Sequence, residues 1–183
     1  MALVHHPVID KNKETIASAV TNLDLHDIAR ACRTYGVKGY FVVTPLADQM
    51  ELAKRIVEHW TIGFGGTYNP QRKEALALVR VTARFEDAMD EITAMEGVRP
   101  KTVVTSARDC PGSLACSTFR HMLEETAPYL LVFGTAWGLT DAFMEEGDYR
   151  LAPLTGAGTY NHLSVRSAVS IILDRLLGVA KGK

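Results

Sequence analysis

Residues 129–139 read YLLVFGTAWGL, an apolar run that ends in a turn containing two glycines. The run is continuously apolar rather than alternating, which is typical of a parallel strand covered by helices on both faces. Gly134 and Gly138 carry no Cβ, so the chain can turn sharply there and its backbone can approach a ligand closely. The stretch predicts a buried strand over 129–133 that ends at a ligand-binding site.

A second turn of this kind follows a shorter apolar run. Residues 149–154 predict a strand, with Pro153 near its end, where a missing N–H is tolerated, and LTGAG follows at 154–158. Ser164 is the predicted N-cap of a helix that runs to about Leu177. Backbone N–H groups at the start of that helix lack partners within it. We therefore expect a nucleotide-like ligand between the two turns.

Two common nucleotide motifs do not fit the chain. Gly156 and Gly158 are followed by Asn161, where the dinucleotide-binding G-x-G-x-x-G motif requires glycine, and no G-x-x-x-x-G-K-[ST] sequence occurs. A third glycine-rich stretch, GFGG at 63–66, is followed by Asn69 and Pro70, and we expect no helix to start there.

Apolar and amphipathic segments alternate along the rest of the chain. Strands are expected at 2–6, 39–43, 75–82 and 101–105, and helices at 25–35, 45–60, 85–95 and 113–125. This alternation predicts an α/β fold with a mostly parallel sheet flanked by helices. No linker or repeat divides the chain, so residues 1–183 are expected to form a single domain.

Composition excludes several classes of protein. The chain has 183 residues, 47% of them hydrophobic, a net charge of −1, and three cysteines without a C-x-x-C pair. Neither a disulfide framework nor a metal site is indicated. No apolar run is long enough to span a membrane and no secretory leader is evident, so we expect a cytoplasmic protein. Nucleic-acid binding would need a local basic patch, contributed by one or two subunits.

These segments together resemble the SPOUT class of S-adenosylmethionine-dependent RNA methyltransferases, the α/β-knot fold. The similarity lies in VFGTAWGL at 132–139, APLTG at 152–156 and HLS at 162–164, followed by the final helix. Near the N-terminus, IARACRTYGV at 28–37 is similar to the first family motif, in which an arginine precedes a glycine by six residues. Two positions depart from the family pattern: Ala136 stands in place of a glutamate, and His162 in place of an asparagine unless Asn161 substitutes.

The resemblance implies S-adenosylmethionine as cofactor, RNA as substrate, and a C-terminal trefoil knot. The acceptor would be a ribose 2′-hydroxyl or a base nitrogen such as guanine N1, in tRNA or rRNA. A homodimer is expected, because the family completes its site across a two-fold axis and because Leu173, Leu176 and Leu177 give the last helix extra apolar surface. The expected cofactor contacts are Thr105, Phe133, Gly134, Thr135, Trp137, Gly138, Leu154, Thr155, Gly156, Asn161, His162, Leu163, Ser164 and Ser167.

Arg30 and His162 are the expected catalytic residues. Arg30 lies off the apolar stripe of its helix. Since arginine stays protonated, its planar fork suits a phosphate next to the target nucleotide better than proton abstraction. His162 either acts on the substrate as donor or proton carrier, or satisfies loop carbonyls.

Other side chains leave two readings open. Arg166 is either a substrate contact or a partner of polar groups near Asp174, and Trp137 either stacks on a base or lies buried under its turn. Arg72 and Lys73 are candidate phosphate contacts, and Ser106 and Arg108 are candidate pocket residues.

The alternative function is a different class of protein. A non-catalytic adenosyl-ligand or RNA-binding protein would keep the fold without transferring a methyl group. The departure at Ala136 and the near-neutral charge favour it.

Overall fold

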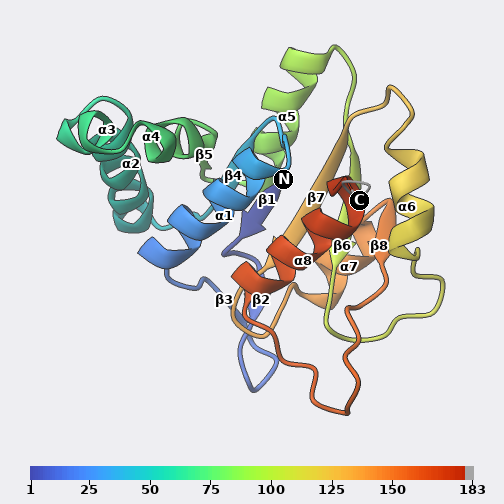
Figure 1. Ribbon diagram of the computed structural model, residues 1–183. Helices are drawn as coiled ribbons and strands as arrows, with labels where there is room; N and C mark the ends of the chain where they lie inside the picture. Colours follow the sequence, from blue (N-terminus) through green and yellow to red (C-terminus); the bar gives the residue numbers. More distant parts are fainter. Residues whose placement is uncertain (180–183) are drawn as a thin grey trace.

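A six-stranded sheet in the order β5-β4-β1-β7-β6-β8 lies at the centre of the computed structural model, which describes residues 1–179; residues 180–183 of the predicted domain lie outside the described part (Figure 1). All neighbouring strands in it run parallel. The strands are β1 (Ala2–Val4), β4 (Tyr40–Val43), β5 (Val79–Thr82), β6 (Lys101–Thr105), β7 (Tyr129–Gly134) and β8 (Tyr149–Leu151), and β2 (Val8–Ile9) and β3 (Thr15–Ile16) form a separate antiparallel hairpin. The helices are α1 (Asn22–Thr34), α2 (Ala47–Thr61), α3 (Phe64–Tyr68), α4 (Pro70–Leu76), α5 (Phe85–Glu96), α6 (Cys116–Met122), α7 (Asp141–Glu146) and α8 (Val165–Leu177).

Helices cover both faces of the sheet. Successive strand residues point to opposite faces, so Leu3 joins a core with α1 and α8, whereas Ala2 and Val4 join a second core with α5 and α7. This double cover explains why the central strands β1, β4 and β7 read as continuous apolar runs. The predicted α/β class with a mostly parallel sheet is confirmed.

The carboxyl ends of the neighbouring strands β4, β1 and β7 lie side by side in the sheet. Val4, the last residue of β1, pairs with Val43 of β4 on one side and with Gly134 of β7 on the other. The segments that follow β1, β7 and β6 therefore emerge at the same edge of the sheet, where ligands of parallel α/β sheets gather.

The prediction for residues 63–82 is wrong in two respects. A helix does begin after Gly63, at Phe64, and residues 70–76 form helix α4, so the strand begins at Val79 rather than at 75. Asn69 and Pro70 are in fact a helix start: the Asn69 side chain accepts a hydrogen bond from the Arg72 amide at 3.0 Å, and proline is favoured at the first helical position.

Other boundaries differ less. The predicted helix at 113–125 is limited to Cys116–Met122, and the predicted strand at 149–154 ends at Leu151. The hairpin β2–β3 and helix α7 were not predicted at all, because elements of two to six residues are too short to establish a periodic pattern.

Candidate functional site

A pocket of about 750 Å³ lies at the carboxyl edge of the sheet. Four segments at strand ends or a helix start line it: 105–108 after β6, 133–138 at the end of β7, 152–154 after β8, and 161–166 at the start of α8. The β2–β3 hairpin and the segment leading into α1 close the other side, with Asp10, Lys11, Lys13, Ser18 and Asp24 among their lining residues. The predicted glycine turn after β7 thus lines the pocket, whereas the second predicted turn contributes only its first residue, Leu154.

Backbone hydrogen bonds hold the turn after β7 in place. The Val4 carbonyl accepts from the Thr135 amide and hydroxyl, each at 3.2 Å, and the Ile9 carbonyl accepts from the Trp137 amide at 3.1 Å. Ala136 and Gly138 take left-handed φ values of 51° and 105°. A Cβ on Gly134 would lie 2.6 Å from the Leu139 amide nitrogen. The turn therefore depends on glycine at 134 and is fastened between β1 and the hairpin.

A buried histidine supports this turn from behind. The side chain of His5 is fully buried, its Nδ1 lies 3.0 Å from the Ser18 hydroxyl, and that hydroxyl is hydrogen-bonded to Thr135. Burial lowers the pKa of His5 to about 4. His5 is therefore neutral near pH 7 and holds Ser18, which in turn is hydrogen-bonded to Thr135.

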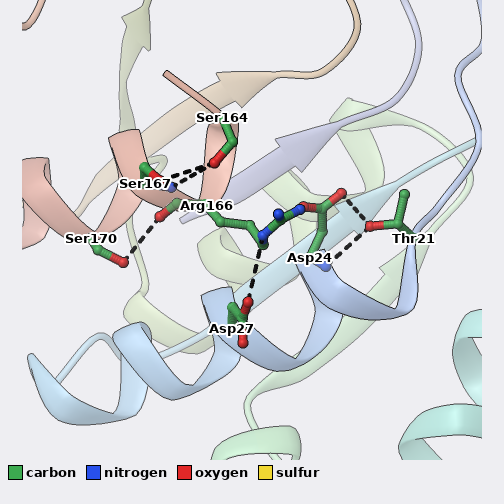
Figure 2. A network of polar contacts seen from close by, with 7 residues as sticks. All are labelled: Thr21, Asp24, Asp27, Ser164, Arg166, Ser167 and Ser170. Atoms are coloured by element: carbon green, nitrogen blue, oxygen red, sulfur yellow. Dashed lines mark hydrogen bonds and ion pairs between the residues drawn. The ribbon is translucent and has the colours of Figure 1, made fainter. Parts of the chain in front are cut away.

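Helix α8 begins at the pocket, where Ser164 caps it as predicted. The Ser164 hydroxyl accepts a hydrogen bond from the Ser167 amide at 3.3 Å, and the next residue but one, Arg166, reaches across to α1 (Figure 2). Arg166 Nη1 donates to Asp24 Oδ1 at 3.1 Å, and its Nε lies 3.5 Å from Asp27 Oδ2. Thr21 donates to the other Asp24 oxygen at 2.6 Å.

The Arg166 network joins the two helices that flank the pocket. Of the two readings of Arg166, the one that pairs it near Asp174 is wrong, since Arg166 pairs with Asp24 and Asp27 and Asp174 accepts a hydrogen bond from Tyr35. Both Arg166 and Asp24 line the pocket, and the Asp24 side chain is only 8% exposed. A buried carboxylate held by a guanidinium and a hydroxyl fixes the distance between α1 and α8 at the pocket.

Most of the expected cofactor residues come together at this pocket. Those that line it are Thr105, Phe133, Gly134, Thr135, Trp137, Gly138, Leu154, Asn161, His162, Leu163 and Ser164. Thr155 and Gly156 lie in the exposed loop that follows, and Ser167 faces Ser164 within the helix cap rather than lining the pocket. Trp137 is 66% exposed, so the reading that placed it under the turn is wrong.

Arg30 lies apart from the pocket of its own chain. It is exposed on α1, as its position off the apolar stripe predicted, and it is not among the pocket-lining residues. Within residues 1–179 its side chain has no hydrogen bond or ion pair. His162, the other expected catalytic residue, does line the pocket and lies beside the Tyr160 ring.

Sequence reasoning missed the hairpin and the acidic residue at the start of α1. Asp10, Lys11 and Lys13 bring charge to the pocket from the hairpin turn, where Asp10 Oδ1 accepts from the amides of Asn12 and Glu14. Asp and Asn in a short polar stretch were the available turn signal. In the described part of the chain, no helix is long and apolar enough to cross a membrane, and no cluster of His, Cys, Asp or Glu could hold a metal ion.

The fold and the pocket at its strand ends define a SPOUT-class architecture. The SpoU methyltransferase AviRb from Streptomyces viridochromogenes, solved in complex with AdoMet, matches with a TM-score of 0.56 at 19% identity, over 97% of this chain and 59% of that one. A putative methylase family protein from Neisseria gonorrhoeae matches with a TM-score of 0.63 at 15% identity, over 100% of this chain and 82% of that one. Likeness at such identities shows the fold; the knotted path of the chain stays a prediction.

The chain belongs to the SAM-dependent RNA methyltransferase family, whose profile matches residues 1–178. It is 45% identical over 179 residues to a tRNA (guanine-N(1)-)-methyltransferase of Oleidesulfovibrio alaskensis, covering 98% of this chain but 42% of that protein. It is 40% identical over 177 residues to an uncharacterized protein of Aquifex aeolicus, covering 96% of this chain and 86% of that one. The family predicted from the motifs, and with it the cofactor S-adenosylmethionine, is confirmed. The chain spans less than half of the Oleidesulfovibrio relative, whose guanine-N1 acceptor is a property of that longer protein.

Proposed function

We propose that this chain is itself an active enzyme, which binds S-adenosylmethionine in the pocket at the carboxyl edge and transfers the methyl group to RNA. The observation that carries the proposal is the meeting of the glycine turn after β7, the segment 152–154 after β8 and the α8 N-terminus at one pocket of about 750 Å³. That volume lies within the range of about 300–1,000 Å³ in which small-molecule sites fall. We further propose that one domain, residues 1–183, carries the activity in the cytoplasm.

The lining residues suit an adenosyl ligand. Leu154, Leu163 and Phe133 offer apolar surface for an adenine ring, while the Asn161 amide, the Thr105 hydroxyl and turn backbone offer hydrogen bonds. Asp10 offers a carboxylate to a ligand that carries positive charge. When bound, S-adenosylmethionine supplies an electrophilic methyl group on a sulfonium ion. The residues around it contribute alignment and exclusion of water.

Two residues are proposed to act on the RNA. The His162 imidazole lines the pocket, where it is placed to take the proton that the acceptor oxygen or nitrogen loses on methylation. Arg30 would grip a phosphate beside the target nucleotide. Because Arg30 lies outside the pocket of its own chain, we propose that it serves the pocket of a second subunit in a homodimer.

The homodimer proposal now rests on Arg30 rather than on the leucines of α8. Leu173 and Leu176 are 2% and 3% exposed within a single chain, and Leu177 is half-buried against the same core. These side chains are used by the subunit's own core and leave little apolar surface for a partner. Of the two reasons for a dimer drawn from the sequence, the one based on these leucines was therefore wrong.

The first experiment is calorimetric titration with S-adenosylmethionine and its demethylated product, with ATP and NAD as controls. We expect selective binding of the two adenosyl ligands at about one per chain. Failure of both to bind would overturn the proposal. Methyl transfer to bulk bacterial RNA is then compared for wild type, Arg30→Ala, Arg30→Lys and His162→Ala, and both alanine variants should lose at least about tenfold in turnover.

Mixing the two alanine variants tests whether the site is shared. If Arg30 acts in the partner's pocket, an equal mixture of Arg30→Ala and His162→Ala subunits contains roughly a quarter of intact sites and regains that share of activity. No recovery after subunit exchange would place Arg30 and His162 in one chain's site or remove Arg30 from the reaction.

The non-catalytic alternative keeps one observation in its favour. Ala136 occupies the position at which the family pattern has a glutamate, and it lies at the rim of the pocket with its side chain exposed. Ligand binding without methyl transfer to any bulk RNA fraction would support an adenosyl-ligand sensor or an RNA-binding protein instead.

A further inference from the structure

Helices α2, α3 and α4 form a helical arm, residues 47–76, that extends beyond the β5 edge of the sheet and packs on α1 (Figure 1). Its outer turn exposes three large apolar side chains: Ile62 is 84%, Phe64 77% and Tyr68 79% exposed. Phe64 and Tyr68 are four residues apart in α3 and therefore lie on the same side of that helical turn. None of the arm's residues lines the pocket.

Helix α3, which carries Phe64 and Tyr68, is packed tightly against the end of α2. A Cβ on Gly65 would lie 2.8 Å from the Trp60 ring and 2.9 Å from the His59 imidazole, and one on Gly66 would lie 2.6 Å from the Trp60 carbonyl oxygen. Only glycine allows α3 to approach Trp60 this closely. The two aromatic rings are thus presented by a segment that is fixed against α2.

Positive charge gathers at the base of the same turn. Residues 59–73 contain no aspartate or glutamate, and they end in Arg72 and Lys73. The Arg72 guanidinium lies 4.5 Å from the centre of the Trp60 ring, and its buried Nε has no hydrogen-bond partner within residues 1–179. Glu74, the next acidic residue, is already paired with Arg33 at 2.9 Å.

A histidine of α1 lies against the same tryptophan. The His26 and Trp60 rings meet edge to face with 5.4 Å between their centres. Burial, together with the positive charges of Arg72 and Arg30, lowers the pKa of His26. Arg72 of the arm and Arg30 of α1 therefore both lie near His26, together with the acidic Asp27.

We propose that the helical arm is the surface on which an unpaired stretch of the substrate RNA docks. In this arrangement Phe64 and Tyr68 stack on bases, and Arg72 and Lys73 contact phosphates. Exposed aromatic rings beside cations, with no carboxylates between them, are the combination that binds single-stranded nucleic acid. The whole arm carries four acidic and four basic residues, so the positive charge is confined to Arg72 and Lys73 at the end of the acid-free stretch 59–73. The inference rests on the proposed RNA methyl transfer and adds to it an RNA contact outside the pocket.

The test is the affinity of the full chain for fluorescently labelled, unfractionated bacterial tRNA, measured by anisotropy at several salt concentrations. Phe64→Ala and Tyr68→Ala should each weaken binding by about five- to a hundredfold, the range for loss of one stacked base. Tyr68→Phe should restore it. Arg72→Gln should reduce the slope of log affinity against log salt by about 0.7–1, because one phosphate contact is lost.

Ile62→Ala is the matched control, since Ile62 is as exposed as Tyr68 and has no aromatic face. It should leave RNA affinity unchanged. Equal losses of RNA affinity for Ile62→Ala and Tyr68→Ala would overturn the proposal, because an aromatic face would then not be what the RNA contacts. A change in sedimentation of the free protein on Phe64→Ala would overturn it in favour of an interface between copies of this chain. Wild-type affinity in both aromatic variants, or no tRNA binding by wild type, would also overturn it.

The same samples separate this inference from the proposed function. Calorimetry with S-adenosylmethionine and methyl transfer are measured on each variant. If wild type transfers methyl groups and the aromatic variants keep their RNA affinity, the RNA-docking role of the arm is rejected and the proposed function stands. If wild type neither binds S-adenosylmethionine nor transfers methyl groups, but its RNA affinity depends on Phe64 and Tyr68, the proposed methyl transfer is rejected and the RNA-docking role of the arm stands.

Discussion

In the pocket, the groups that face a ligand belong to short backbone segments from distant parts of the sequence, whereas in the helical arm they are side chains of one continuous segment. The pocket turns are fastened by hydrogen bonds to β1 and the hairpin. The arm is held by ring packing around Trp60. Backbone contacts select a ligand closely by its shape. Exposed aromatic rings and cations can bind nucleic acids of many different sequences. The first arrangement suits one small ligand and the second a variable polymer.

The largest expected effect is the difference in S-adenosylmethionine binding between alanine substitutions at two glycines, Gly134 and Gly156. Gly134→Ala places a Cβ 2.6 Å from the Leu139 amide nitrogen, whereas a Cβ on Gly156 meets nothing within 4 Å. Gly134→Ala should therefore lower stability by about 1–3 kcal/mol and abolish measurable binding of S-adenosylmethionine in calorimetry. Gly156→Ala should bind like wild type. Normal binding by Gly134→Ala would contradict the role assigned to this turn.

Acid should affect the pocket through His5. The pKa of His5 is about 4 in the folded protein, against an ordinary value of 6.5, so the unfolded chain binds more protons between these two values. Stability is therefore fully present above about pH 6.5, falls as pH drops through this window, and levels off below about pH 4, with a total loss of about 3 kcal/mol.

Urea unfolding at a series of pH values measures this loss. His5→Asn should flatten the pH dependence between pH 7 and 4.5. His26 of α1, whose pKa is also lowered but which is only half-buried, serves as the comparison, and His26→Asn should flatten it less. An unchanged slope in His5→Asn would show that other groups carry the acid sensitivity.

A smaller difference in stability is expected between substitutions in two arginine–carboxylate ion pairs, one buried and one exposed. Arg166 holds Asp24, whose side chain is 8% exposed, whereas Arg33 and Glu74 are 56% and 59% exposed at the foot of the arm. Arg166→Met leaves a buried carboxylate short of a partner and should cost about 1–3 kcal/mol. Arg33→Met should cost less than about 1 kcal/mol. Chemical denaturation of both variants tests the order, and equal costs would contradict it.

The smallest expected effects are changes in tryptophan fluorescence, which report separately on the pocket and on the arm. Trp137 lies at the pocket and Trp60 in the arm, and the chain has no others. S-adenosylmethionine should change the emission of Trp60→Phe, which retains Trp137, but not that of Trp137→Phe. Unfractionated tRNA should change the emission of Trp137→Phe, which retains Trp60. Trp60→Phe should also lose about 0.5–1 kcal/mol of stability with the Arg72 contact.

Local patterns allowed much of the fold to be predicted. The strand at Lys101–Thr105, the helix from Phe85, and the capping of α8 by Ser164 were all predicted from the sequence and are present. Each depends on residues within a few positions of one another. Helix α2 of the arm was predicted, but α3 was not, because Gly65 and Gly66 are poor helix formers whose contacts with Trp60 compensate for that weakness.

The sequence by itself determined the alternating α/β plan and the glycine turn after β7 that lines the pocket, because apolar runs, glycines and cap residues act over short distances. Only the tertiary structure paired Arg166 with Asp24, linked His5 through Ser18 to Thr135, and set Phe64 and Tyr68 outward. These contacts join residues far apart in the chain, and no periodicity or spacing encodes such partners. Their geometry follows from how the helices pack on the sheet.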